Sequence, residues 1–124
     1  MLTIRQEQME VFHQAAQAQF VHETLLHVRR HFPEEVERLG DEEARAWVRH
    51  GTLRAESHGL TLESNIRRYV DLMFAFGHDF DMDPTMPWAN TILEQPSQMS
   101  ETARMDWLYE TALAQLDEPT NGAR

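Results

Sequence analysis

The sequence predicts an all-α protein, a single-domain bundle of about five helices that begins with a long amphipathic helix. Three observations predict this class. Apolar residues recur at helical spacing along the chain, and the period-two alternation of half-buried strands is absent. Proline, glycine and capping residues then divide the chain into segments with short connections, as in helical bundles. We expect one domain over residues 1–116 and a flexible polar tail over residues 117–124.

The first predicted helix covers residues 3–32, a stretch without proline or glycine. Its apolar stripe returns every seven residues and gains further members on the same side. The stripe consists of Ile4, Val11, Ala15, Ala18, Val21, Leu25, Val28 and Phe32. Thirty residues at about 1.5 Å each span roughly 45 Å, which is longer than a small domain is wide. The sequence leaves open whether this helix breaks or one of its ends projects.

The next two helices follow from their start and stop signals. Pro33 suits the first position of a short helix that ends at Gly40. Asp41 is a good N-cap for the third helix, which runs to Gly59. Gly51 lies inside that helix and costs about 1 kcal/mol of helix propensity relative to alanine. We therefore expect another helix to pack closely at Gly51.

Three helical segments follow, with an acidic corner before the second of them. Thr61 is predicted to cap a helix that reaches Gly77, and Ser100 to cap the last helix. Between them lie the corner GHDFDMDPTMPWAN, residues 77–90, and a short helix over residues 87–95. We expect this corner to be structural, with aspartates that cap the following helix, two stiffening prolines and two aromatic anchors. Its residues are Asp79, Asp81, Asp83 and Trp88, with Phe80 as the second anchor.

The composition of the chain argues against several kinds of binding site and partner. The chain has 124 residues, no cysteine and a formal net charge of −10. Without cysteine there is neither a disulfide framework nor a thiolate metal site. An acidic surface repels a phosphate backbone, and no apolar run approaches the ~20 residues of a membrane span. The N-terminus lacks a secretory signal. We expect a cytoplasmic protein that binds neither nucleic acid nor membrane.

A calcium loop is the first metal site to consider. The aspartates at 79, 81 and 83 occupy the first, third and fifth places of an EF-hand loop. The sixth place requires glycine and holds Pro84, and the twelfth requires a bidentate glutamate and holds Asn90. The EF-hand pattern therefore fails at both critical positions.

A zinc signature fails in a similar way. His22 and Glu23 begin an HExxH pattern, but the second ligand position holds Leu26. His27 and His31 share one helix face, yet two histidines are too few for a zinc site without an outside carboxylate. We interpret His22 as a core histidine, and predict no metal site and no cofactor.

Catalytic motifs are also missing. The chain has no GxSxG elbow and no glycine-rich phosphate loop, and its paired glutamates lie at helix starts, where acids are favoured. We therefore predict a protein that is not an enzyme.

The first helix carries a second apolar face. It is formed by Met9, Phe12, Ala16 and Phe20 and extended by His13, His27 and His31. A helix with two apolar sides is either central to its own bundle or half-buried against another chain. We predict a partner-binding surface, used for helix-in-groove recognition or for a homodimer. Its residues are Met9, Phe12, Ala16, Phe20 and His27.

Several strings of the sequence together resemble a known group of proteins. They are LTIRQEQM, HVRRHFPEEVERLGDEE, GLTLESNIRRYVDLMFAFGHDFDMDP, PWANTILEQ and ARMDWLYETAL. The chain resembles small all-helical accessory proteins encoded beside VgrG-spike, PAAR-tip and effector genes in bacterial type VI secretion clusters. The resemblance covers residues 2–116, and its most specific part is residues 76–93. The individual strings carry no known chemistry.

The resemblance implies a co-chaperone or adaptor that assists loading of an effector onto the secretion spike. Its partner would be the effector, an effector chaperone or the spike. An immunity protein that neutralises a toxin is the alternative, because an acidic domain suits a basic active-site cleft. A metal-binding helical protein, using either the three corner aspartates or His27 and His31, is the third possibility.

Overall fold

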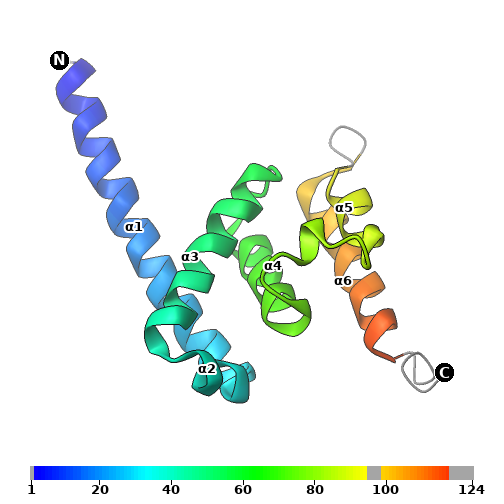
Figure 1. Cartoon of the computed structure of the whole chain (residues 1–124). Coiled ribbons are helices and arrows are strands. Elements are labelled where there is room, and N and C mark those ends of the chain that lie inside the picture. Colours follow the sequence, from blue (N-terminus) through cyan, green and yellow to red (C-terminus); the bar gives the residue numbers. More distant parts are fainter. Residues whose placement is uncertain (1, 95–98, 118–124) are drawn as a thin grey trace. The chain divides into compact units, whose positions relative to one another are not determined.

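The computed structural model describes residues 2–94 and 99–117, with the side chains of residues 16–94 and 99–116. The all-α class is confirmed, since these residues form six α-helices, one short 3-10 helix and no strand (Figure 1). The elements are α1 (Leu2–His31), α2 (Pro33–Leu39), α3 (Asp41–Ser57), α4 (Glu63–Phe76), η1 (Phe80–Met82), α5 (Pro87–Leu93) and α6 (Glu101–Asp117). Of the predicted polar tail, residues 118–124 lie outside the described residues.

The chain divides into two compact units, Met1–Arg49 (unit 1) and His50–Arg124 (unit 2), and the boundary lies inside α3. That residues 1–116 form one domain stays a prediction.

Unit 1 is built on one unbroken helix. The ribbon of α1 continues without a kink from Leu2 to His31 (Figure 1), which answers the question that the sequence left open. Phe32 leaves the helical conformation, at φ −132° and ψ 57°, immediately before Pro33. The short helix α2 then packs against α1. Arg29 of α1 donates a hydrogen bond to Asp41 at the start of α3, at 3.0 Å.

The buried face of α1 differs from the predicted stripe. From residue 16 onward, the buried side chains are Phe20, Val21, Thr24, Leu25 and Val28. Ala18 and His22 are exposed, so the interpretation of His22 as a core histidine is wrong. Phe20, predicted to face a partner, is only 4% exposed. The buried arc is therefore rotated toward Phe20 and Thr24 and includes a polar residue that hydrophobic periodicity overlooks.

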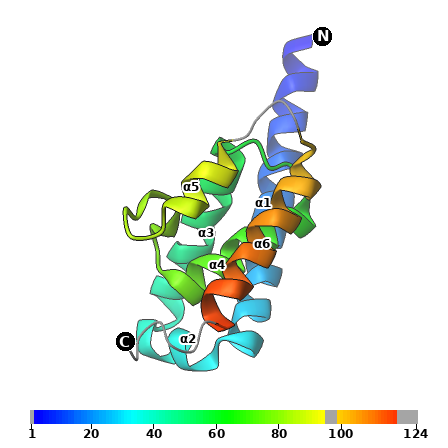
Figure 2. The same cartoon turned by 90° about the vertical axis from the view of Figure 1, so that its right-hand side faces the viewer.

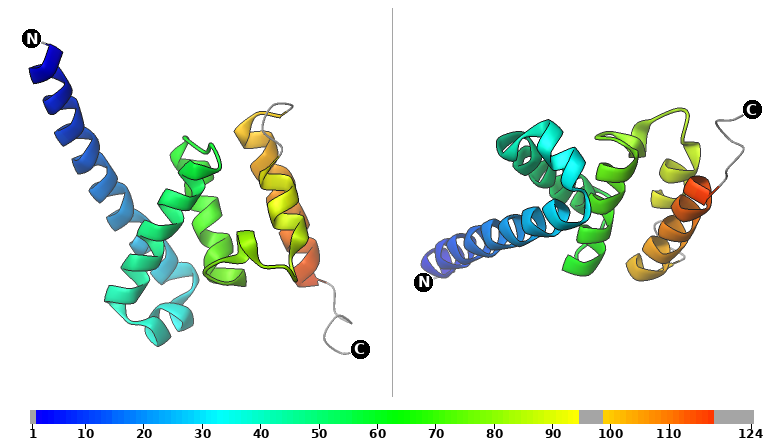
Figure 3. Two further views of the ribbon diagram at one scale, coloured as in Figure 1. Left: turned by 45° about the horizontal axis from the view of Figure 1, so that its top comes forward. Right: turned by 90° about the horizontal axis from the view of Figure 1, so that it is seen from below.

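In unit 2, helix α6 has two helical neighbours. This helix packs against both α4 and α5, and α5 packs against η1 (Figures 2 and 3). The largest fully buried side chains of the unit come from α4, η1, α6 and the α3–α4 connection. They are Leu60, Tyr69, Met73, Phe80, Met105 and Leu108. Because the corner residue Phe80 is among them, the corner is part of the core of unit 2.

Of the N-caps predicted for α6 and α4, the first is confirmed and the second is wrong. Ser100 caps α6, since its hydroxyl oxygen accepts a hydrogen bond from the backbone N–H of Ala103 at 3.1 Å. Thr61 does not cap α4, whose N-cap is Leu62. The Thr61 hydroxyl instead donates to the carboxylate of Glu101 on α6 at 2.6 Å, so it joins two helices of unit 2.

Close packing at Gly51 is confirmed. A Cβ added there would overlap the sulfur of Met73 and lie 3.1 Å from a methyl group of Val70, both on α4. Met73 and Val70 are fully buried and have little room to move.

We expect Gly51→Ala to lower the free energy of unfolding by about 1 kcal/mol. Overpacking costs about 1–3 kcal/mol, and the gain in helix propensity offsets about 1 kcal/mol of it. Urea denaturation measures the change. In a Met73→Ala background the overlap is gone, so Gly51→Ala should leave the free energy of unfolding unchanged or raise it. An equal loss of stability in both backgrounds would contradict the packing explanation.

Candidate functional site

The three aspartates of the corner have different surroundings. Asp79 is 62% exposed and contacts two histidines. Asp81 is 1% exposed and pairs with Arg54 and His58. Asp83 accepts hydrogen bonds from the backbone and hydroxyl of Thr85, at 2.9 and 2.7 Å. The three carboxylates therefore do not converge on a common cation.

The prediction that these aspartates cap the next helix is wrong. The N-cap of α5 is Met86, which makes no capping hydrogen bond through its side chain. Pro87 occupies the first turn of α5, where its missing N–H costs nothing. Trp88 is half-buried and packs edge-on against Phe76 of α4, with ring centroids 5.5 Å apart.

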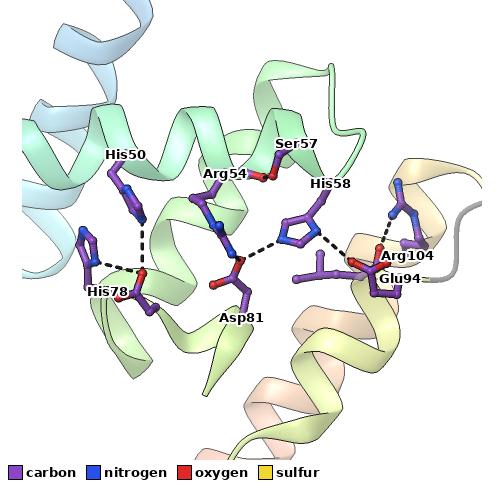
Figure 4. A network of polar contacts seen from close by, with 10 residues as sticks. His50, Arg54, Ser57, His58, His78, Asp81, Glu94 and Arg104 are labelled. Atoms are coloured by element: carbon purple, nitrogen blue, oxygen red, sulfur yellow. Dashed lines mark hydrogen bonds and ion pairs between the residues drawn. The ribbon is translucent and has the colours of Figure 1, made fainter. Parts of the chain in front are cut away.

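Asp81 is the centre of a polar network inside unit 2 (Figure 4). Arg54 donates to its Oδ2 from Nε at 3.0 Å and also from Nη2. His58 Nε2 lies 2.9 Å from the same oxygen, and His58 Nδ1 lies 3.8 Å from Glu94. The other carboxylate oxygen, Oδ1, and the hydroxyl of Tyr69 are buried without a hydrogen bond. One buried aspartate thus connects α3 to the corner.

The environment changes the acidity of two groups in this network. Burial acts to raise the pKa of Asp81, but hydrogen bonds from His58 and Arg54 outweigh burial and hold that pKa below its usual value. Burial, reinforced by the negative charge of Asp81, raises the pKa of the Tyr69 phenol. The network therefore contains an ionised carboxylate beside a neutral phenol.

His58 also faces an open hollow. The hollow is lined by Ser57, His58, Gly59, Leu93, Glu94 and Arg104. An aspartate behind a histidine is the arrangement that orients a general base. Here Arg54 contacts the same carboxylate oxygen, and Ser57 donates its hydroxyl proton to the backbone oxygen of Arg54. Arg54 and His58 thus share one carboxylate oxygen of Asp81.

A second cluster, His50–His78–Asp79, lies at the other end of the corner and is the candidate metal centre. His50 comes from α3, whereas His78 and Asp79 follow α4. Asp79 Oδ1 lies 3.4 Å from His50 Nε2 and 3.2 Å from His78 Nδ1. The two imidazole rings stack with centroids 4.0 Å apart (Figure 4). Among the described residues this is the one group of three or more histidine and carboxylate side chains within metal-binding distance.

The predicted partner-binding residues of α1 have mixed positions. Ala16 is exposed and His27 is half-buried, whereas Phe20 belongs to the core. The side chains of Met9 and Phe12 lie outside the described residues. His27 and His31 place their rings 4.4 Å apart, as their spacing predicts. Phe20 is therefore removed from the predicted surface, because a buried ring cannot contact a partner without unfolding.

Sequence reasoning missed both clusters of unit 2. His50 precedes His78 by 28 positions, and Arg54 precedes Asp81 by 27, so neither pair forms a local motif. A signal was nevertheless available. Position 50 and position 54 are one helical turn apart on α3, and their partners are the first and third residues of the DFD string.

Within the residues that the structure describes, no helix combines the length and the apolar character needed to cross a membrane. Comparison with known proteins adds no relative to these observations: no family model, no curated protein and no solved structure matches the chain.

Proposed function

We propose that this chain is a non-enzymatic protein-binding module that acts as an adaptor or co-chaperone in loading a type VI secretion effector. Helix α1 carries the proposal. It is 30 residues long without a break, or about 45 Å. In unit 1 it is followed by α2, of 7 residues, and by residues 41–49 of α3, which span only about 10 and 13 Å. Placed end to end, these two elements of unit 1 span only about half the length of α1.

The N-terminal half of α1 is therefore the proposed docking segment. The sequence gives it the spaced apolar residues Met9 and Phe12, and Ala16 continues the same side. Anchors at such spacing are typical of an amphipathic helix that lies in an apolar groove of a partner. With a net charge of −10, the chain favours a partner whose groove is bordered by basic side chains.

The test compares two double variants, each of which adds two negative charges to α1. Met9→Asp with Phe12→Asp changes the proposed surface, whereas Ala18→Asp with His22→Asp changes exposed positions centred about 130° away around the helix. Each protein, with a histidine-free affinity tag, is used to capture partners from its own bacterium for mass spectrometry. The captured protein is then purified and titrated by calorimetry.

We expect the wild type and the control to bind the same partner, and the Met9/Phe12 variant to bind at least about tenfold more weakly, because a charge in an apolar groove must be desolvated. The thermal melts should coincide. Equal binding by both variants would contradict the proposal, and a lower melting temperature for the Met9/Phe12 variant alone would assign those residues to the core.

An immunity role predicts a different cellular result. An adaptor stabilises or exports its effector without inhibiting it, whereas an immunity protein keeps toxin-expressing cells alive. Co-expression with the captured partner separates the two.

A further inference from the structure

The geometry points to a divalent transition-metal site at His50, His78 and Asp79, and we propose that it binds zinc. The ligand set is two imidazole nitrogens and one carboxylate oxygen, with no fourth protein ligand among the described residues. Sites with three such ligands keep a coordination position open for water or another ligand. This site lies in unit 2 and is independent of the proposed docking segment of α1.

Distances between the ligand atoms support the assignment. Two ligands of a tetrahedral zinc ion, each about 2.0–2.1 Å from the metal, lie roughly 3.3 Å apart. The two contacts of Asp79 Oδ1 with the histidine nitrogens, 3.4 and 3.2 Å, match this spacing. All three ligand atoms lie within 4.8 Å of one another. The Asp79 carboxylate therefore lies at a distance from each imidazole nitrogen at which both could bind the same zinc ion.

An unsatisfied atom gives an independent indication of a ligand. His50 Nε2 is buried and makes no hydrogen bond, although it faces Asp79. A buried polar atom without a partner costs about 1–3 kcal/mol, and native structures contain few of them. A metal ion on this nitrogen would satisfy it and would be balanced by the Asp79 carboxylate.

The ion also has a path to the site. An open hollow lined by residues 76–80, Met82 and Asp83 reaches both His78 and Asp79. The side chains of His50, His78 and Asp79 are 35%, 37% and 62% exposed. Each imidazole lone pair lies in the plane of its ring, and the two stacked planes differ by only 19°, so the rings must rotate before both can point at one ion. Side chains with this much exposure can do so without disturbing the core.

Geometry also selects this cluster over the other metal candidates. Among the corner aspartates, Asp81 is occupied by Arg54 and His58, and Asp83 by Thr85. The His27–His31 pair supplies two ligands and belongs to unit 1. A nitrogen-rich set of this kind favours zinc and its neighbours in the Irving–Williams order over calcium, which prefers oxygen ligands alone.

Titration of the tag-free chain with zinc tests the proposal. Isothermal calorimetry should give one zinc ion per chain, and zinc at ten times its dissociation constant should raise the melting temperature by about 5 °C. In NMR spectra, zinc should move the imidazole resonances of His50 and His78. Millimolar calcium should change neither the melt nor the spectrum.

Variants assign the site. His50→Ala, His78→Ala and Asp79→Asn should each weaken zinc binding at least about tenfold, because loss of a ligand exceeds the 10–100-fold effect typical of outer-shell changes. The matched control His27→Ala with His31→Ala should bind like the wild type. Melts in EDTA check that each variant is folded. Unchanged affinity in the single variants, loss of binding in the control, or no binding by the wild type would overturn the proposal.

Discussion

Replacing Asp81 by alanine is expected to lower the free energy of unfolding by about 3 kcal/mol, because it leaves buried cationic and polar groups without their partner. Asp81 is 1% exposed, and its Oδ2 receives Arg54 and His58. Removal of one member of a buried pair costs about 3–5 kcal/mol. We expect the lower end of that range, since the Arg54 side chain is 29% exposed and water can partly solvate its guanidinium.

Urea denaturation at neutral pH in EDTA provides the measurement, and Asp79→Ala is the control. Asp79 belongs to the same corner but is 62% exposed, so its loss should stay within about 0.5 kcal/mol. In an Arg54→Ala background, Asp81→Ala should lower the free energy of unfolding by clearly less, because the guanidinium that would lose its partner is already absent. Similar losses for Asp79→Ala and Asp81→Ala would mean that the network does not stabilise the fold.

The sign of the pH dependence follows from the lowered pKa of Asp81. Its carboxyl has a usual pKa of 3.8 and a lower one in the folded chain. The folded state therefore prefers the ionised form, and the stabilisation is complete above the usual value and lost as the pH falls through the lower one. Asp81→Ala should remove this part of the acid sensitivity.

The helices could be predicted because their signals are local. Pro33, Gly40 and Gly59 mark ends that the structure has within two residues, and Ser100 caps α6. Gly51 was informative for a different reason. A residue that is costly in a helix needs a compensating contact, and α4 supplies it.

The direction of burial could not be predicted with the same precision. Phe20 and His22 lie two positions apart, on different sides of α1, and only the surrounding elements decide which one is covered. Helical periodicity gives the face to within a residue or two. For α1, an error of that size was enough to assign the buried Phe20 to the docking surface.

The corner shows the same limit for chemistry. In the sequence, Asp79, Asp81 and Asp83 are equivalent members of one alternating string. In the fold, the 3-10 helix η1 directs them into three environments, and the ligands that complete each environment come from α3 or from the corner itself. Residue type and spacing therefore could not distinguish the buried ion pair from the candidate metal ligand.

Glu101 should have the second largest effect on stability. Its carboxylate joins the start of α6 to the segment that leads into α4. It accepts hydrogen bonds from the backbone N–H groups of Thr61 and Leu62, at 3.0 and 3.1 Å, and from the amide of Asn65 at 2.9 Å. Burial acts to raise the pKa of Glu101, but the hydrogen bonds from Asn65, Thr61 and Leu62 outweigh burial and lower that pKa to about 2.

We expect Glu101→Gln to lower the free energy of unfolding by about 1–2 kcal/mol at neutral pH. A hydrogen bond to a charged group contributes about 1.5–3 kcal/mol, and partial exposure of this carboxylate to water reduces that value. Glutamine keeps the shape and one acceptor oxygen, but its NH2 group replaces the other acceptor, so the charge and part of the hydrogen bonding are lost together. Glu110→Gln, on an exposed position of the same helix, is the matched control and should change the stability by less than about 0.5 kcal/mol.

The pH dependence separates this charge effect from a packing effect. The folded-state pKa of about 2 lies below the usual value of 4.5, so the contribution of Glu101 is fully present above about pH 5 and is lost as the pH falls toward 2. Denaturation curves of the wild type and of Glu101→Gln should therefore converge over that range, while Glu110→Gln stays parallel to the wild type. If the difference persisted at pH 2, lost packing rather than lost charge would explain it, and the carboxylate would not be the group that connects α4 to α6.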